Sequence, residues 1–243
     1  MIKDKIYFAS DFHLGSPNFQ ASLNREKKII RWLNTIEKDA KSIYLMGDIF
    51  DFWFEYKKAV PKGFIRLFGK IAELTDKGID IIFFTGNHDM WVSDYFQKEL
   101  GISVIKKECI VSISGVKLFI GHGDGLGNGD NKYKILKNIF KSTVCNWLFS
   151  RIHPNLGLLI GQKWSLSSNK SQNIIKLKNN QLINYSKKQQ KINKVDYYIF
   201  GHTHSPLEID IDSECKYVNL GDWINYNTYA VLDQESLKLK TFK

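Results

Sequence analysis

Two histidines stand one residue apart in the segment Ile199–Pro206 (IFGHTHSP), at the end of an apolar run. Because residues i and i+2 of an extended segment point to the same side, His202 and His204 can face one point in space. The alternative is a chance pair of surface histidines in a loop. As a pair of imidazoles, they predict half of a metal site that needs further ligands from elsewhere in the chain.

Four other segments place ligand-type residues just after an apolar run, and each contains a glycine. The segments are ASDFHLG with Asp11 and His13, YLMGD with Asp48, FFTGNHD with Asn87, and LFIGHGD with His122. A single segment of this kind is usually only a turn. In α/β proteins, however, functional residues gather at the carboxyl ends of strands, and glycine there permits close approach of backbones. Five such segments in one chain therefore predict a single site.

The combined set has nitrogen and oxygen donors and no thiolate: Asp11, His13, Asp48, Asn87, His122, His202 and His204. One ion cannot use seven such side chains, but two ions that share a carboxylate can. Mixed imidazole and carboxylate ligands suit Mn²⁺, iron or Zn²⁺ better than Ca²⁺ or Mg²⁺ alone. Two ions ~3.5–4 Å apart clamp a phosphoryl group and turn a bridging water into hydroxide, so the predicted chemistry is phosphoryl hydrolysis.

The elements that must position these ligands alternate between strands and helices in the first half of the chain. Apolar periodicity predicts strands at 5–10, 42–47 and 79–86, helices at 24–40, 64–78 and 94–101, and a strand pair at 109–121. A mostly helical segment follows, and then strands at 195–201, 207–211, 216–221, 228–233 and 237–242. We predict an α/β core over 1–124 and 193–243 and a helical insert over 125–192.

The charge of the chain is concentrated in this insert. The net charge is +10, yet residues 131–194 hold thirteen Lys or Arg and no Asp or Glu, so the remainder is slightly acidic. A segment of 64 residues without an acid indicates an anionic surface or substrate. The three cysteines form no disulfide pattern, and neither a signal peptide nor a run of about 18 apolar residues is present. We therefore expect a cytoplasmic protein that is not integral to a membrane.

The motifs DFH, GD, GNHD, GH and GHTH, in this order and at these intervals, resemble the calcineurin-like metallophosphoesterase superfamily. The resemblance spans Asp11 to His204 and implies a four-layer αββα sandwich with metals at the strand ends. It also implies two ligand sets that share Asp48. One set is Asp11, His13, Asp48 and His204, and the other is Asp48, Asn87, His122 and His202.

A narrower resemblance rests on GDIFDFWF, on HGDGL and on a helical insert between HGD and GHTH. These features are similar to those of the UDP-2,3-diacylglucosamine hydrolases, the pyrophosphatases of lipid A biosynthesis. The resemblance implies release of UMP and 2,3-diacylglucosamine 1-phosphate with two divalent ions, for which we expect Mn²⁺. It implies an acyl-chain pocket under the insert, so we expect a protein that is peripheral on the inner face of the cytoplasmic membrane. As a separate expectation, we predict a monomer.

Two other functions stay open at this point. Another metallophosphoesterase, such as a nuclease or a phosphodiesterase, would use the basic segment to follow a phosphate backbone. The many Leu, Ile, Phe and Trp residues among these lysines argue against that function, so no nucleic acid is expected. A scaffold with a dead site is the second alternative, but every ligand position of the motif is filled.

The sequence departs from the narrower family at one position. Its well-known members carry Arg in GNRD, whereas this chain has His88 in GNHD. The broad superfamily uses this histidine beside the leaving group. A phosphate leaving group needs little protonation, so a pyrophosphatase tolerates either residue. We expect His88 and Asp89 to be catalytic, with Asp89 orienting the His88 ring; the alternative is that Asp89 only caps a turn.

Substrate contacts are predicted in three places. Aromatic residues follow Asp48 closely, HGDGL supplies an acid, and the insert combines apolar and basic side chains at helical spacing. Exposed Lys in such a segment can meet a diphosphate or an anionic leaflet. The candidates are Phe52, Trp53, Asp124, Lys132, Lys134, Ile139, Phe140, Trp147 and Lys163.

Overall fold

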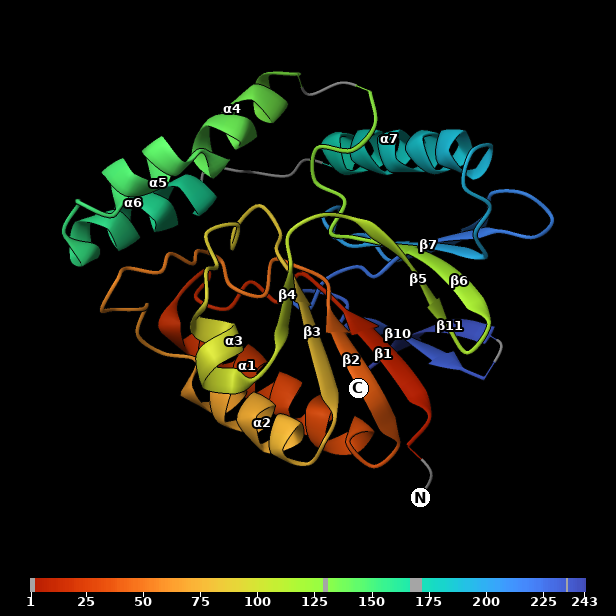
Figure 1. Ribbon diagram of the computed structural model, residues 1–243, viewed down its shortest axis with the longest axis horizontal. Coiled ribbons are helices and arrows are strands. Elements are labelled where there is room, and N and C mark those ends of the chain that lie inside the picture. The colour runs from red at the N-terminus through yellow and green to blue at the C-terminus, as the bar shows by residue number, and fades with distance from the viewer. Residues whose placement is uncertain (1–2, 129–130, 167–171, 235) are drawn as a thin grey trace.

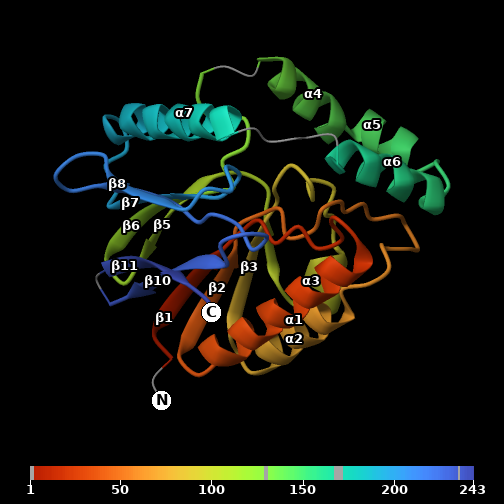
Figure 2. The same ribbon diagram turned by 180° about the vertical axis from the view of Figure 1, so that it is seen from behind.

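Two β-sheets pack face to face, with helices on their outer faces (Figures 1 and 2). The structure is a computed structural model that describes residues 3–128, 131–166, 172–234 and 236–243. The predicted four-layer αββα sandwich is confirmed. Its importance for function is that parallel strands from both sheets end on the same side of the molecule.

The first sheet has the strand order β11-β10-β1-β2-β3-β4. The four strands from β1 to β4 are parallel, and β10 joins them antiparallel beside β1. Its strands are β1 (Lys5–Ala9), β2 (Ala40–Leu45), β3 (Asp80–Phe84), β4 (Ser103–Ile105), β10 (Thr228–Asp233) and β11 (Ser236–Thr241). Strand β4 was not predicted, because three residues are too few to show an alternating pattern.

The second sheet has the order β5-β6-β7-β9-β8. Strands β6, β7 and β9 are parallel in its centre, and β5 and β8 close its edges antiparallel. Its strands are β5 (Cys109–Ile113), β6 (Val116–Ile120), β7 (Tyr197–Phe200), β8 (Leu207–Asp210) and β9 (Lys216–Asn219). A buried apolar cluster that includes Phe8, Met46 and Ile199 fills the space between the two sheets.

Three helices cover the outer face of the first sheet: α1 (Phe19–Ile36), α2 (Ile65–Asp76) and α3 (Tyr95–Leu100) (Figure 1). The predicted start of α1 was five residues late. The Asn18 side chain accepts a hydrogen bond from the Ala21 amide at 2.9 Å, and this N-cap begins the helix at Phe19. Apolar residues of α1 and α2, such as Trp32 and Leu67, are fully buried against this sheet.

The predicted insert divides into two parts. Helices α4 (Asn131–Lys141), α5 (Thr143–Phe149) and α6 (Pro154–Leu166) lie beyond the strand ends, away from both sheets (Figures 1 and 2). Helix α7 (Gln172–Gln190) instead lies along the outer face of the second sheet, where Leu182, Ile183 and Tyr185 pack with Phe119 and Tyr198. We therefore assign α7 to the core as its fourth layer, which moves the boundary predicted at residue 192.

Candidate metal centre

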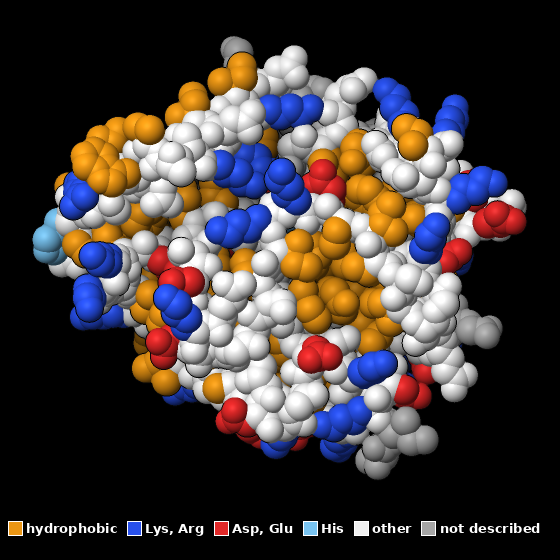
Figure 3. Space-filling model, in the orientation of Figure 1, with side chains coloured by type: hydrophobic (Ala, Val, Ile, Leu, Met, Phe, Trp, Pro, Cys, Tyr) orange, Lys and Arg blue, Asp and Glu red, His pale blue; other side chains and the backbone are white. Residues whose placement is uncertain are grey.

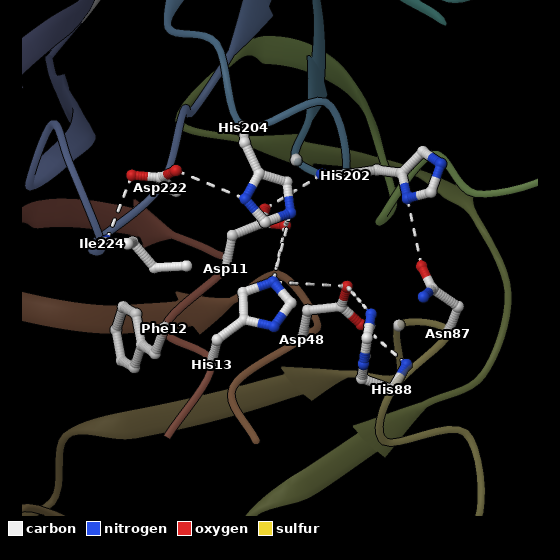
Figure 4. Close-up of polar contacts among 12 residues, drawn as sticks. Asp11, Phe12, His13, Asp48, Asn87, His88, His202, His204, Asp222 and Ile224 are labelled. Atoms are coloured by element: carbon white, nitrogen blue, oxygen red, sulfur yellow. Dashed lines mark hydrogen bonds and ion pairs between the residues drawn. The ribbon is translucent and has the colours of Figure 1, made fainter. Parts of the chain in front are cut away.

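The side chains that the motifs singled out converge at one end of the sandwich, and Figure 4 labels all of them except His122. Asp11 and His13 follow β1, Asp48 follows β2 and Asn87 follows β3. His122 follows β6, and His202 and His204 follow β7, so the two sheets both contribute. The structure brings together all seven residues that the sequence predicted.

One group of donors consists of Asp11, His13, Asp48 and His204, whose ligand atoms all lie within 4.8 Å of one another. The His204 Nε2 atom is 3.2 Å from His13 Nε2 and 3.2 Å from Asp11 Oδ1. Bonds of about 2.0–2.2 Å from a metal to nitrogen and oxygen bring two ligand atoms to such a separation. This group therefore has the dimensions of a single-ion site.

A second group shares one residue with the first. Asp48, His122 and His202 also present ligand atoms within 4.8 Å of one another. The Asp48 Oδ2 atom is 3.2 Å from His122 Nε2, and the Asn87 Oδ1 atom is 3.1 Å from His202 Nδ1. The geometry thus gives two neighbouring groups of donors with Asp48 in both.

The backbone at the site adopts a conformation that non-glycine residues rarely use. Five of the seven donors have φ angles between 45° and 66°, in the left-handed region: Asp11, His13, Asp48, His202 and His204. Such strain concentrates at functional sites. Glycines allow the close packing, since a Cβ atom on Gly86 would overlap the Asp48 carboxylate and one on Gly201 would overlap the Asp11 carboxylate.

The electrostatics of the donors also fit a cation. Asp11 Oδ1, Asp48 Oδ2 and His122 Nε2 are buried, and none has a hydrogen-bond partner among the described residues. Burial opposes the charge of Asp48, but His122 and His88 outweigh it and hold its pKa well below the usual range. Burial opposes the charge of His122 too, yet Asp48 outweighs it and raises its pKa to about 10. The carboxylates thus require positive charge here, which divalent ions would supply.

The outer nitrogens of the ligand histidines have their own partners. The Asp51 carboxylate lies 3.3 Å from His13 Nδ1, the Asp222 carboxylate lies 3.3 Å from His204 Nδ1, and the Met46 carbonyl oxygen lies 2.9 Å from His122 Nδ1. Such contacts fix the ring orientation and direct Nε2 toward the ion. Sequence reasoning missed Asp51 and Asp222, although Asp222 follows Gly221 just beyond β9 in the same arrangement as the predicted ligands.

The two predicted catalytic residues occupy different positions. The His88 ring donates from Nδ1 to the Asp51 carbonyl oxygen at 2.8 Å, and its Nε2 atom is 3.9 Å from Asp48 Oδ2. Burial lowers the pKa of His88 from its ordinary value, and Asp48 opposes this effect. Asp89 does not orient the ring as we expected. Its carboxylate is fully buried and accepts hydrogen bonds from the Gly86 and Ile49 amides, so it joins the loops after β2 and β3.

A cavity of about 240 Å³ extends from these ligands toward the insert. Asn87, His88 and His202 line its metal side. Apolar side chains line most of the rest, and Lys137 and Lys178 add two cations. The apolar lining is Phe52, Met90, Trp91, Leu136 and Phe140. A molecule whose anionic group lies at the metal ligands can therefore extend its apolar part directly into this cavity.

Among the predicted substrate contacts whose side chains the structure describes, Phe52 and Phe140 alone line this cavity. Trp53 is fully buried and packs against Phe50 and Phe96 in the core, which corrects its assignment. Asp124 pairs with Lys137, and Lys134 donates to the Gly127 carbonyl oxygen, so these two hold α4 in place.

Three further candidates lie outside the cavity lining. Ile139 and Trp147 are 51% and 56% exposed, and Lys163 is exposed. The Lys132 side chain lies outside the described part of the structure. Lys178, which lines the cavity together with Lys137, was not among the residues that the sequence suggested.

Comparisons with known proteins agree with this geometry. The family model for calcineurin-like phosphoesterases matches residues 4–206, a range that includes all seven donors. A UDP-2,3-diacylglucosamine hydrolase of Porphyromonas gingivalis is 37% identical over 259 residues, covering 100% of this chain and 99% of that protein. A protein of the same name from Vibrio parahaemolyticus is 27% identical over 238 residues and covers 96% of each chain.

Among solved structures, the E. coli phosphoesterase Yfce aligns with a TM-score of 0.48 at 19% identity. The alignment covers 98% of this chain and 92% of that one. The assignment rests on the family model, on the full-length relative and on the convergence of the seven donors at the strand ends. This chain belongs to the calcineurin-like phosphoesterase family.

Proposed function

We propose that this protein hydrolyses the pyrophosphate bond of UDP-2,3-diacylglucosamine and releases UMP and 2,3-diacylglucosamine 1-phosphate, a step of lipid A biosynthesis. The observation that carries the proposal is the cavity that joins the metal ligands Asn87 and His202 to the apolar side chains of α4. The substrate has two matching parts: an anhydride, which would lie at the metal ligands, and acyl chains, which suit the apolar lining. The two relatives described above carry the name of this activity.

Different residues would bind the two ions and contact the phosphoryl group. Asp11, His13, Asp48 and His204 would hold one ion, and Asp48, Asn87, His122 and His202 would hold the other; we propose Mn²⁺ for both. When bound, two such ions polarise phosphoryl oxygens and lower the pKa of a coordinated water. His88 lines the cavity beside them and would contact the phosphoryl group, while Asp51 holds both His13 and the His88 ring in place.

The acyl chains need more room than the cavity offers. A volume of about 240 Å³ is below the roughly 300–1,000 Å³ of sites for drug-sized ligands, so part of the chains must lie outside it. Exposed apolar residues of α4–α6 adjoin the cavity, and hydrophobic and basic side chains are interspersed over this region (Figure 3, upper left). We propose that these helices bind the chains and contact the membrane from the cytoplasmic side.

Location and assembly are part of the same proposal. No helix of the described residues has both the length and the apolar character needed to cross a bilayer. A peripheral position on the inner face of the cytoplasmic membrane would bring the basic side chains to an anionic leaflet. We propose that the protein acts there as a monomer and binds no nucleic acid.

The decisive assay supplies detergent-dispersed UDP-2,3-diacylglucosamine to the purified protein. We expect UMP and the diacylated sugar phosphate to form, a chelator to stop the reaction and Mn²⁺ to restore it. Replacing Phe140 with Asn should raise KM for this substrate far more than for a short soluble phosphodiester. Ile192→Asn is the matched control, since Ile192 is exposed beyond α7 and does not line the cavity. Turnover of oligonucleotides but not of the glycolipid would refute the proposal.

A further inference from the structure

A second cavity, of about 610 Å³, opens where the N-terminal ends of α1 and α2 approach each other. It shares Asp51 with the apolar cavity, and Gly15, two residues beyond the metal ligand His13, also lines it. The Asp51 carboxylate is 3.3 Å from His13 Nδ1. Both cavities therefore adjoin Asp51 beside the metal centre, one on each side of it, and a molecule held at the donors could reach into both.

The second cavity differs from the first in its charge and in its exposed side chains. Lys62 and Arg66 line it, both are exposed, and neither forms an ion pair with a described residue. The one other acid in its lining besides Asp51 is Glu26, whose carboxylate already accepts hydrogen bonds from the Arg66 and Leu67 amides. The two cations are therefore available to an anionic ligand.

An aromatic ring completes the lining. The Phe19 side chain is 79% exposed at the start of α1, and none of the aromatic pairs among the described residues includes it. An exposed ring next to free cations suits a nucleotide, because a base stacks on the ring while Lys or Arg binds phosphate. A purely apolar ligand would gain nothing from the cations, and a bare phosphate would gain nothing from Phe19.

We infer that this second cavity binds the nucleoside monophosphate half of the substrate, with the base against Phe19. Its phosphate, one end of the anhydride, would lie at the metal ligands on the side of this cavity, where Lys62 and Arg66 add positive charge. The inference rests on the proposed function in one respect: the substrate has a lipid end and a nucleotide end joined at the anhydride. The first cavity suits the lipid end, because most of its lining away from the donors is apolar. The cavity that shares Asp51 with it then receives the other end, and the anhydride lies at the ligands between them.

The test measures binding of UMP and of uridine to the full-length, Mn²⁺-loaded protein by calorimetry. Lys62→Ala/Arg66→Ala should weaken UMP binding about tenfold or more and leave uridine binding unchanged. Phe19→Ala should weaken both by a similar factor, since stacking does not require the phosphate. Lys58→Ala is the matched control: Lys58 is an exposed lysine that lines a different cavity, and its loss should change neither affinity.

The outcomes separate this inference from the proposed function. If the wild-type protein hydrolyses the glycolipid but the variants bind UMP as tightly as it does, the nucleotide lies elsewhere and the inference is overturned. If the variants lose UMP affinity while the glycolipid is not hydrolysed, the nucleotide site stands and the proposed substrate is wrong. Loss of vesicle binding by Phe19→Ala with unchanged uridine affinity would identify Phe19 as a membrane contact and refute the inference.

Discussion

Asp48 lies between the two groups of donors at the centre. Its Oδ2 atom faces His122 Nε2 at 3.2 Å and His13 Nε2 at 3.8 Å, and its Oδ1 atom accepts a hydrogen bond from the His88 amide. Asp48 is therefore a member of both donor groups, whereas His204 belongs to one. Replacing Asp48 and replacing His204 should therefore remove different numbers of bound ions.

Replacing Asp48 with Ala should cost both ions, because neither group keeps enough donors. Replacing His204 with Ala should leave about one ion of the two that such centres hold. Metal analysis of the purified variants checks the stoichiometry, and circular dichroism checks that both remain folded. Both variants should lose nearly all hydrolytic activity. Equal metal content in the two variants would contradict the shared role of Asp48.

Asp222 offers a finer test, because it touches the ligand His204 and not the ion. Asp222→Asn keeps the size of the side chain but removes the negative charge that orients the His204 ring. Loss of such a contact typically weakens metal affinity roughly 10–100-fold. Competition with a chelator of known affinity measures this change in metal affinity. The Asp222 carboxylate also accepts hydrogen bonds from the backbone amides of Ile224 and Asn225. Unchanged metal affinity would show that its role is limited to these backbone contacts.

Periodicity and strand position were enough to predict the metal donors from the sequence. The seven donors stand just after apolar runs, so their convergence followed from the rule that parallel strands end together. Phe52 and Trp53 show the limit, since both follow Asp48 but only Phe52 faces the cavity while Trp53 is buried in the core. Which of two adjacent aromatic rings faces inward depends on a loop conformation that no local pattern specifies.

Helices α1 and α2 are joined by a buried polar contact. The Glu26 carboxylate of α1 accepts hydrogen bonds at 3.0 and 3.1 Å from the Arg66 and Leu67 amides, in the first turn of α2. Phe64, the N-cap residue of α2, makes no side-chain cap hydrogen bond. A residue of another helix thus satisfies amides that an N-cap side chain would otherwise bind.

Replacing Glu26 with Ala should lower the free energy of unfolding by about 1–2 kcal/mol, because two amides of the first turn of α2, one of them buried, lose their acceptor. Glu26→Gln retains an oxygen acceptor and should lose less. Urea denaturation of the metal-free protein measures both. Glu73→Ala, on the half-exposed side of α2, serves as the control. A loss in Glu26→Gln equal to that in Glu26→Ala would show that charge, and not the acceptor, stabilises α2.

Element boundaries were harder to predict than element types. The periodic pattern of α1 was clear, yet its first turn carries Phe19 exposed to solvent, so the apolar spacing began only later in the chain. Helix α7 looked like part of the insert because lysines surround its few apolar residues. Leu182 and Tyr185 nevertheless pack against the second sheet, a tertiary contact that composition does not report.

On the face of the molecule formed by α5 and α6, exposed apolar side chains and basic side chains occur together. Helices α5 and α6 expose Val144, Trp147, Leu148, Leu156 and Leu159 by 53–66%. Arg151 lies over the Trp147 ring, 4.8 Å from its centroid. Basic residues contribute about 1 kcal/mol each near an anionic membrane surface. This combination is expected of a protein that contacts a membrane from one side.

Val144→Glu and Trp147→Glu should each reduce binding to phosphatidylglycerol vesicles by about tenfold, since each puts a charge on the contact surface. Sedimentation with vesicles at low and high salt measures the change. Ile192→Glu is the matched control, because Ile192 is 74% exposed but lies beyond α7. Equal losses in all three variants would indicate a general charge effect and no defined membrane face.

The ligand set has a consequence for the order of folding. His13 and His204 are 191 residues apart in the chain, and they meet only after the two sheets have packed. Closing so long a loop is a late event, so a folding transition state that lacks the docked sheets cannot bind the ions. Mn²⁺ should then slow unfolding by its full stabilising effect and leave the refolding rate unchanged. Stopped-flow measurements with and without the ion would test this, and faster refolding with Mn²⁺ would place the sheet packing before the barrier.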